Sequence, residues 1–252
     1  MPARTRLRRG FTLIEVMTAV VILIILAALA VTFMVYGMGK ARMNNAVFDM
    51  TAMINSAQMR AISRGSPHYI FIHQTPDNRL RLLLLERPDD GTAISWNALD
   101  LTQEPDVVLA YTRTLPNNTL ETRNATIHDQ LVLAASSGMD SGGLAFLDLD
   151  SNRITKPLPA PFSAIPLTTP QTTPSELNKP TQDLAAGCNF CVSPSGRPYG
   201  VLRFNSDGTM KVMTGNVPSG AVIAFAPSTE DEKGFTPKLL TVSAPAGAAV
   251  VF

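Results

Sequence analysis

The feature that most constrains this chain is an uncharged apolar run close to its N-terminus. No charged residue occurs from Val16 to Gly39, a stretch of 24 residues. As an α-helix this run would extend for about 36 Å, more than the roughly 30 Å of a bilayer's hydrocarbon core. The run therefore predicts a helix that crosses a membrane once.

The flanking charges predict its direction. Four arginines lie in the first ten residues, whereas only Lys40 and Arg42 follow the run closely. This bias favours a cytoplasmic N-terminus and places the later residues outside the inner membrane. An ordinary secretory signal is cleaved after a shorter apolar region. Here the candidate cleavage residue, Gly10, precedes the run, so cleavage would leave the helix on the mature protein.

One acid lies near the start of the apolar segment. Glu15 is costly in a membrane helix, and such residues usually mark a partner. Cleavage before Phe11 would expose a positively charged amine a few residues away, and in a stack of helices one subunit's carboxylate would pair with its neighbour's amine. The alternative is an interfacial glutamate solvated by lipid headgroups.

These residues carry a family resemblance. The run RRGFTLIEVMTAVVILIILAALAV resembles the class III leader and N-terminal helix of type IV prepilins and type II secretion pseudopilins. The resemblance implies a leader peptide over 1–10, cleavage by prepilin peptidase between Gly10 and Phe11, N-methylation of Phe11, and an assembly role for Glu15. It also implies a transmembrane and polymerisation helix over 11–40. Many pilins carry a proline where this chain has Thr32.

The pattern then becomes amphipathic, which predicts that the helix continues over 41–65 and packs on a globular head. Gly65 followed by Pro67 predicts its end near Arg64. The following apolar residues recur at spacings of three and four: Met43, Ala46, Val47, Met50, Met53, Ile54, Ala57 and Ala61.

Short β patterns fill the rest of the chain, 66–252, and predict an α+β fold with an antiparallel β-sheet head. Asp207-Gly208 predicts a hairpin turn. The candidate strands are Tyr69–Ile72, Leu80–Leu85, Val107–Tyr111, Thr126–His128, Gly143–Leu147, Leu202–Asn205, Met210–Thr214, Ala221–Phe225, Leu239–Val242 and Ala248–Phe252.

A second, weaker resemblance narrows the family. Ala57–Pro67, Arg203–Thr209 and the closing strand Leu239–Val242 are similar to segments of the GspH/FimT group, which includes FimT and FimU minor pilins and the H-type pseudopilin of type II secretion. The resemblance implies the type IV pilin fold, in which a long helix packs on the sheet. It favours a minor subunit at or near a filament tip.

A Pro-rich segment over 155–187 interrupts the head. Its prolines suppress regular structure and favour extended chain. We expect a long exposed insertion, either a partner-recognition element or a passive loop. The prolines lie at positions 157, 159, 161, 166, 170, 174 and 180.

Cys188 and Cys191 form a CxxC pair in the wrong context for a thioredoxin-like site, which follows a strand and begins a helix. Zinc would need two more ligands, and the three histidines, His68, His73 and His128, are scattered in the sequence. We expect a disulfide, because the head is placed outside the cytoplasm.

No arrangement of nucleophile, base and orienting acid is recognisable, so we expect neither an enzyme nor a cofactor or metal site. Asp148–Asn152 has calcium-loop spacing but fails the EF-hand pattern, and a solvated turn is expected.

The sequence therefore predicts a structural minor pilin or pseudopilin, a single-pass inner-membrane protein that enters a pilus or pseudopilus. The expected partners are prepilin peptidase, the inner-membrane assembly platform, the major pilin and other minor pilins or pseudopilins. The alternative is a DNA-binding minor pilin. The net charge of +1 and the uncharged residues 244–252 make nucleic acid an unfavoured partner.

Overall fold

The structure is a computed structural model. It describes residues 12–75, 79–86, 110–124, 126–133, 144–169, 179–193, 197–227 and 236–252. The chain divides into two compact units, Met1–Met38 and Gly39–Phe252.

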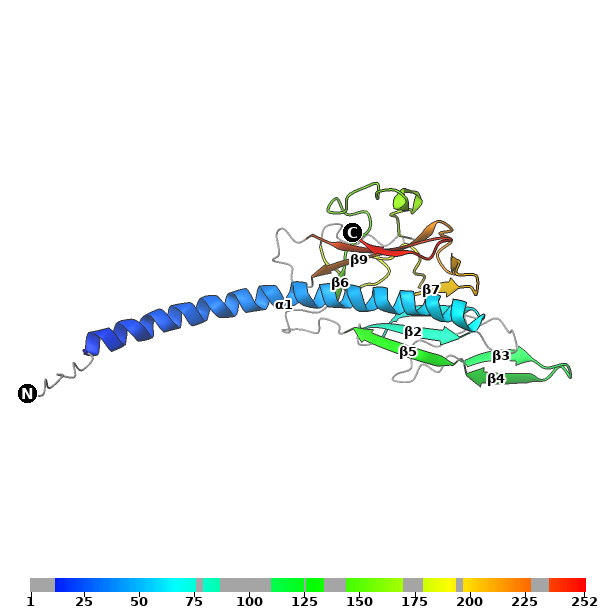
Figure 1. Cartoon of the computed structure of the whole chain (residues 1–252), viewed down its shortest axis with the longest axis horizontal. Helices are drawn as coiled ribbons and strands as arrows, with labels where there is room; N and C mark the ends of the chain where they lie inside the picture. Colours follow the sequence, from blue (N-terminus) through cyan, green and yellow to red (C-terminus); the bar gives the residue numbers. More distant parts are fainter. Residues whose placement is uncertain are drawn as a thin grey trace, which may run out of the picture. The chain divides into compact units, whose positions relative to one another are not determined.

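One helix, α1, extends from Leu13 to Arg64 (Figure 1). Its first turn is capped by Thr12, whose Oγ1 accepts the backbone N–H of Glu15 at 3.4 Å. Gly65 ends it with a φ of +66°, a left-handed conformation that glycine adopts without a Cβ penalty. The predicted helix, from Phe11 to about Arg64, therefore agrees closely with the observed one, which continues through Gly37 and Gly39 without a break.

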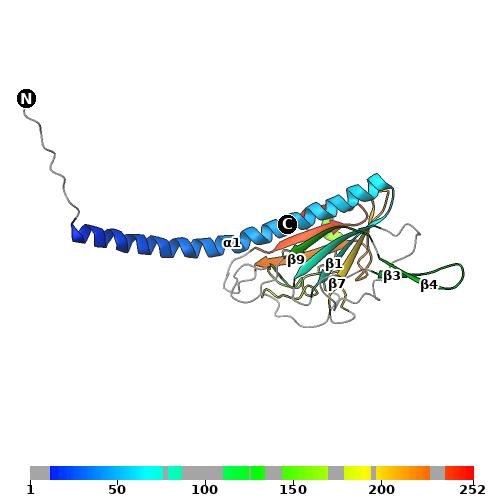
Figure 2. The same ribbon diagram turned by 90° about the horizontal axis from the view of Figure 1, so that it is seen from below.

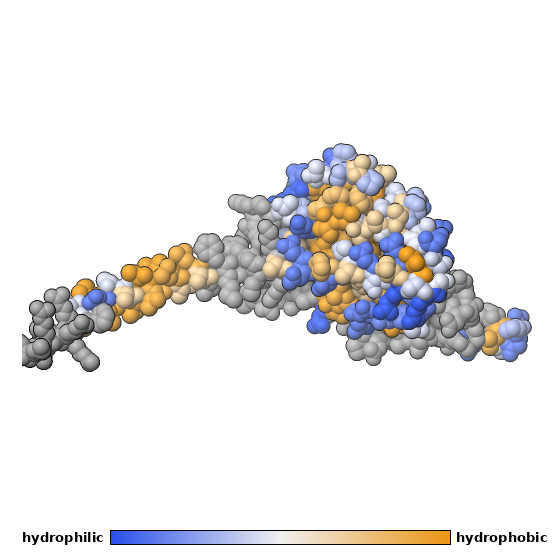
Figure 3. Space-filling view, in the orientation of Figure 1, coloured by the Kyte–Doolittle hydropathy of each residue, from blue (hydrophilic) through white to orange (hydrophobic). Residues whose placement is uncertain are grey.

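The first unit contains the apolar part of α1. Leu13–Ala30 has a mean hydropathy of 2.8, none of it is buried, and it is long and apolar enough to cross a membrane. Figure 3 shows the segment as an almost continuous hydrophobic surface. Because these side chains have no protein covering among the described residues, the segment is consistent with membrane anchoring.

The second unit contains two antiparallel sheets and a separate two-stranded hairpin. The five-stranded sheet A has the order β5-β2-β1-β7-β8, the four-stranded sheet C has the order β11-β10-β9-β6, and β3 pairs with β4. The strands are β1 (His68–Gln74), β2 (Leu80–Glu86), β3 (Ala110–Thr114), β4 (Leu120–Asn124), β5 (Ile127–Leu133), β6 (Leu144–Phe146), β7 (Tyr199–Phe204), β8 (Met210–Val212), β9 (Gly220–Pro227), β10 (Lys238–Ser243) and β11 (Ala249–Val251).

The second half of α1 forms one core with both sheets. All the apolar residues predicted to face the head, from Met43 to Ala61, are buried there. The same cluster contains Ile70 and Leu84 of sheet A and Ile223 of sheet C. Figure 1 shows β9 and β6 on one side of the helix and β2 and β5 on the other, and Figure 2 shows both sheets beneath it. An α+β fold with antiparallel sheets is confirmed.

The described part of the Pro-rich segment is exposed only in part, because its apolar side chains are buried against the head. A second core covers the opposite face of sheet C, where Val222, Ala224 and Leu239 pack. A short 3₁₀ helix, η2 (Phe162–Ala164), belongs to this layer and appears at the top of Figure 1. Alternation along β9 explains both cores, because successive residues point to opposite faces. The segment's contribution to the second core is Leu158, Phe162, Ile165 and Leu167, all buried.

Candidate assembly site, disulfide loop and histidine cluster

The candidate assembly residue, Glu15, lies in the first turn of α1 and is exposed. Its backbone N–H contacts the Thr12 carbonyl oxygen at 3.1 Å, and its carbonyl accepts the Thr18 hydroxyl at 3.0 Å. A carboxylate in a first helical turn is favoured by the helix dipole. No hydrogen bond or ion pair connects its carboxylate to another residue that the structure describes.

The predicted cleavage and methylation positions, Gly10 and Phe11, lie outside the described residues. The nearest described residue, Thr12, immediately precedes α1.

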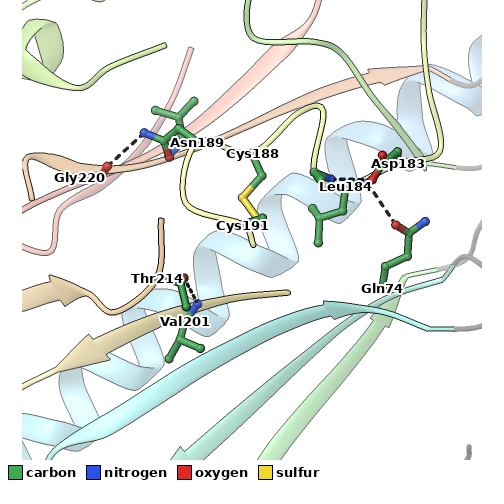
Figure 4. Close-up of a disulfide and its surroundings, with 11 residues drawn as sticks. Gln74, Asp183, Leu184, Cys188, Asn189, Cys191, Val201, Thr214 and Gly220 are labelled. Carbon is green, nitrogen blue, oxygen red and sulfur yellow. Dashed lines mark hydrogen bonds between the residues drawn. A yellow bond between two sulfur atoms is a disulfide. The ribbon is translucent and has the colours of Figure 1, made fainter. Parts of the chain in front are cut away.

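Cys188 and Cys191 are joined by a disulfide, and both are fully buried. Figure 4 shows their loop between strands of the two sheets. Cys188 bridges to Ile223 of β9, and Val192, after the second cysteine, bridges to Tyr199 of β7. The geometry gives the pair a structural role in connecting the sheets.

The side chain of Asn189, inside this loop, forms hydrogen bonds with backbone groups of sheet C and of the Pro-rich segment. Its Oδ1 accepts the N–H of Val222 at 2.7 Å, and its Nδ2 donates to the carbonyl of Pro166 at 3.0 Å. The Nδ2 also donates to the carbonyl of Gly220 at 3.3 Å (Figure 4). This one buried side chain thus satisfies two backbone groups of β9, at Gly220 and Val222, and one in the Pro-rich layer, at Pro166.

Two positions next to the disulfide loop are glycines because the loop approaches their backbone too closely for a side chain. A Cβ at Gly200 would lie 2.4 Å from Phe190 Cε2, and a Cβ at Gly215 would lie 2.5 Å from Phe190 Cα. Gly215 also has a φ of +72°.

Asp148 and Asp150 form a turn, as expected, but only part of it is solvated. Asp148 is buried, and its Oδ1 accepts the N–H of Asp150 at 2.8 Å. Asp150 instead faces Lys156, with 3.3 Å between Oδ1 and Nζ.

Two of the three histidines, scattered in the sequence, meet in the fold. His68 is directly opposite Glu86 in the β1–β2 pairing, and β5 brings His128 to the same end of sheet A. His128 Nε2 lies 2.6 Å from Glu86 Oε2, and the rings of His68 and His128 stack with centroids 5.6 Å apart. Sequence reasoning missed this cluster.

Residues around the α1 end hold the Glu86 carboxylate. Ser66 Oγ donates to Oε1 at 2.8 Å and Arg64 Nη1 donates to Oε2 at 2.8 Å. Burial acts to raise the pKa of Glu86, but the hydrogen bonds from Ser66 and His128 outweigh it, and the pKa lies below its usual value. The pKa of His68 is lowered, mainly by burial.

The third histidine, His73, is separate from the cluster. It is fully buried on β1, and burial together with the nearby charge of Arg81 lowers its pKa to about 4.

Residues 5–31 match the model of the prokaryotic N-terminal methylation motif. No curated protein and no solved structure matches the chain. The motif supports a type IV pilin-like protein that prepilin peptidase processes, and it covers Gly10, Phe11 and Glu15.

Proposed function

We propose that this chain is a structural minor pilin of a type IV pilus, or a pseudopilin of type II secretion, of the GspH/FimT kind. Prepilin peptidase removes residues 1–10 and methylates Phe11, and the mature subunit enters the filament at or near its tip. The observation that best supports this proposal is the methylation motif at 5–31, which includes the apolar segment Leu13–Ala30, none of which is buried.

The assembly step uses the helix surface. In the membrane, apolar side chains of Leu13–Ala30 contact lipid, and in a filament they pack against the same segment of neighbouring subunits. A carboxylate in this apolar setting needs a partner of opposite charge. The N-terminal amine created at Phe11 of a neighbouring subunit supplies that charge to Glu15.

Maturation is tested first. Intact-mass and N-terminal analysis of protein from membranes, with and without prepilin peptidase, should show loss of residues 1–10 and a methylated Phe11 only with the peptidase. An uncut chain, or a cut elsewhere, would reduce the protein to a tethered head and end the filament proposal.

Assembly is tested by charge removal. Glu15→Gln should insert into the membrane and be cleaved normally, yet be lost from sheared filaments. Asp49→Asn is the matched control, because Asp49 is an exposed acid on α1 outside the apolar segment. Filament incorporation of Glu15→Gln at the control's level would contradict the role of Glu15.

DNA uptake is the rival function from the sequence analysis. A gel shift with the mature chain at physiological salt distinguishes it, because phosphate-driven binding requires cationic side chains and 244–252 has none. We expect no shift.

A further inference from the structure

The His68, Glu86 and His128 cluster lies where three strands and the end of α1 converge. His68 begins β1, Glu86 ends β2, and His128 lies near the start of β5. One ligand atom from each residue lies within 4.8 Å of the other two. Two imidazoles and one carboxylate make a nitrogen and oxygen donor set typical of transition-metal sites.

The buried imidazole of His68 provides an independent observation. Its ring is fully buried, and Nδ1 lies 3.0 Å from the Ser66 carbonyl oxygen. That contact requires the hydrogen on Nδ1 and leaves a lone pair on Nε2. Within the described part of the chain, His68 Nε2 has no hydrogen-bond partner, although it is buried. A buried polar atom without a partner is costly in a native protein and calls for an explanation.

The surrounding contacts resemble the support that metal ligands receive. A ligating histidine usually donates its other N–H to a carbonyl or carboxylate, which fixes the ring and the tautomer. His68 does this through Ser66, and Ser66 Oγ also orients the Glu86 carboxylate at 2.8 Å. A single residue after α1 thus positions two of the three donors.

We propose that His68, Glu86 and His128 form a binding site for a divalent transition metal of the zinc class, with His68 Nε2, His128 Nε2 and a Glu86 carboxylate oxygen as ligands. Water completes the coordination. The metal holds the chain that leaves α1 against β1, β2 and β5.

Only modest movement is required. Donor atoms that share a tetrahedral zinc lie roughly 3.3 Å apart, given bonds of about 2.0–2.1 Å. The His128–Glu86 contact of 2.6 Å is already shorter, and one nitrogen of each histidine and one oxygen of Glu86 all lie within 4.8 Å of one another. Rotation of the partly exposed Glu86 and His128 side chains closes the difference. Coordination by His128 Nε2 requires the imidazole to carry its hydrogen on Nδ1.

Arg64 competes with the metal, because its guanidinium contacts Glu86 Oε2 at 2.8 Å. Its side chain is 49% exposed, so it can move into solvent when a cation binds. This contact distinguishes the two uses of the cluster. Arg64 stabilises a metal-free ion pair with Glu86, but it opposes a second cation at the same carboxylate.

The test uses the full chain in detergent, titrated with Zn²⁺ against a chromophoric chelator, with Co²⁺ as a spectroscopic probe. The wild type should bind one equivalent of zinc and give the ligand-field bands of tetrahedral Co²⁺. His128→Gln and Glu86→Gln should weaken binding by roughly tenfold or more, since even residues that only orient ligands contribute 10–100-fold. Asp129→Asn, an exposed neighbour on β5, is the matched control and should bind like the wild type.

Arg64→Gln should change the zinc affinity in the opposite direction to the ligand variants, because removing the competing cation should tighten zinc binding. It keeps the proposal falsifiable if a ligand variant folds poorly. No saturable zinc binding by the wild type, equal binding by His128→Gln, or weaker binding by Arg64→Gln would each overturn the site. The cluster would then be an ion-pair network of Arg64, Glu86 and His128 only.

Discussion

The conformation of the disulfide loop depends on the packing and hydrogen bonds of a few individual residues. Phe190, between the two cysteines, fills space that the missing side chains of Gly200 and Gly215 leave free. Asn189, which lies in the same loop, forms hydrogen bonds with three backbone groups outside it. The loop therefore depends on residues that are far away in sequence, and small changes there should disturb it.

Two glycines with similar backbone angles allow the cost of backbone strain to be distinguished from the cost of steric overlap. Gly215 and Gly65 have φ values of +72° and +66°, but only Gly215 has backbone atoms within 3 Å of an added Cβ. Gly65→Ala should lower the free energy of unfolding by about 1 kcal/mol, the left-handed penalty. Gly215→Ala should lower it by about 3 kcal/mol or more, because the overlap adds to that penalty. Denaturant unfolding of both variants measures the difference, and equal losses would contradict the close packing.

At the scale of elements, sequence reasoning succeeded where the signal was local. The periodicity from Met43 to Ala61 and the stop at Gly65 predicted the second half of α1, and Asp207-Gly208 predicted the β7–β8 turn, in which Gly208 has a φ of +82°. The strand β4 was missed because Leu120–Asn124 is mostly polar and lacks alternation. The nearby turn signal Asn117-Asn118, with Asn118 at a φ of +62°, would have indicated a hairpin.

Pairings over long sequence distances could not be predicted. His68 and Glu86 become neighbours through an adjacent hairpin, but His128 reaches them only because β5 pairs with β2 across the separate β3–β4 hairpin. The Pro-rich segment was predicted to be exposed because composition does not reveal that the outer face of sheet C is apolar. Leu158 and Phe162 cover that face.

The strand β1 should make stability depend on pH through His73. Its pKa is 6.5 in an ordinary setting and about 4 in the fold, so between these values the unfolded chain binds more protons. The contribution of neutral His73 to the free energy of unfolding is fully present above about pH 6.5, and it is lost as the pH falls through about 4. The shift corresponds to about 3 kcal/mol.

His73→Leu should remove this part of the pH dependence. The measurement is the free energy of unfolding from pH 4 to 7 for both proteins, compared by difference, because His68 and Glu86 also titrate in acid. A variant whose profile parallels the wild type's would show that His73 is not the source.

At the scale of the whole molecule, the apolar segment belongs to the first unit and the hydrophobic cores belong to the second. Leu13–Ala30 contributes nothing to the described cores, and among the α1 side chains that the structure describes, Met43 is the first in the core of the head. Membrane attachment and head stability should therefore be separable.

A chain that begins at Gly39 should be soluble without detergent and fold cooperatively. Its midpoint of unfolding should match that of the full chain's head, measured by near-ultraviolet circular dichroism. An aggregated or non-cooperative product would show that the head needs the earlier part of α1.

The sharing of α1 between the membrane segment and the head core has a mechanical consequence. The helix is continuous from Leu13 to Arg64, and its second half is held by both sheets. Gln58 adds hydrogen bonds from α1 to the carbonyls of Gly208 and Ala246, at 2.9 and 3.0 Å. Tension along the helix would load many buried contacts in parallel, in shear, instead of unzipping them one at a time. A protein built in this way should resist extraction by force better than an equilibrium free energy of unfolding alone would suggest.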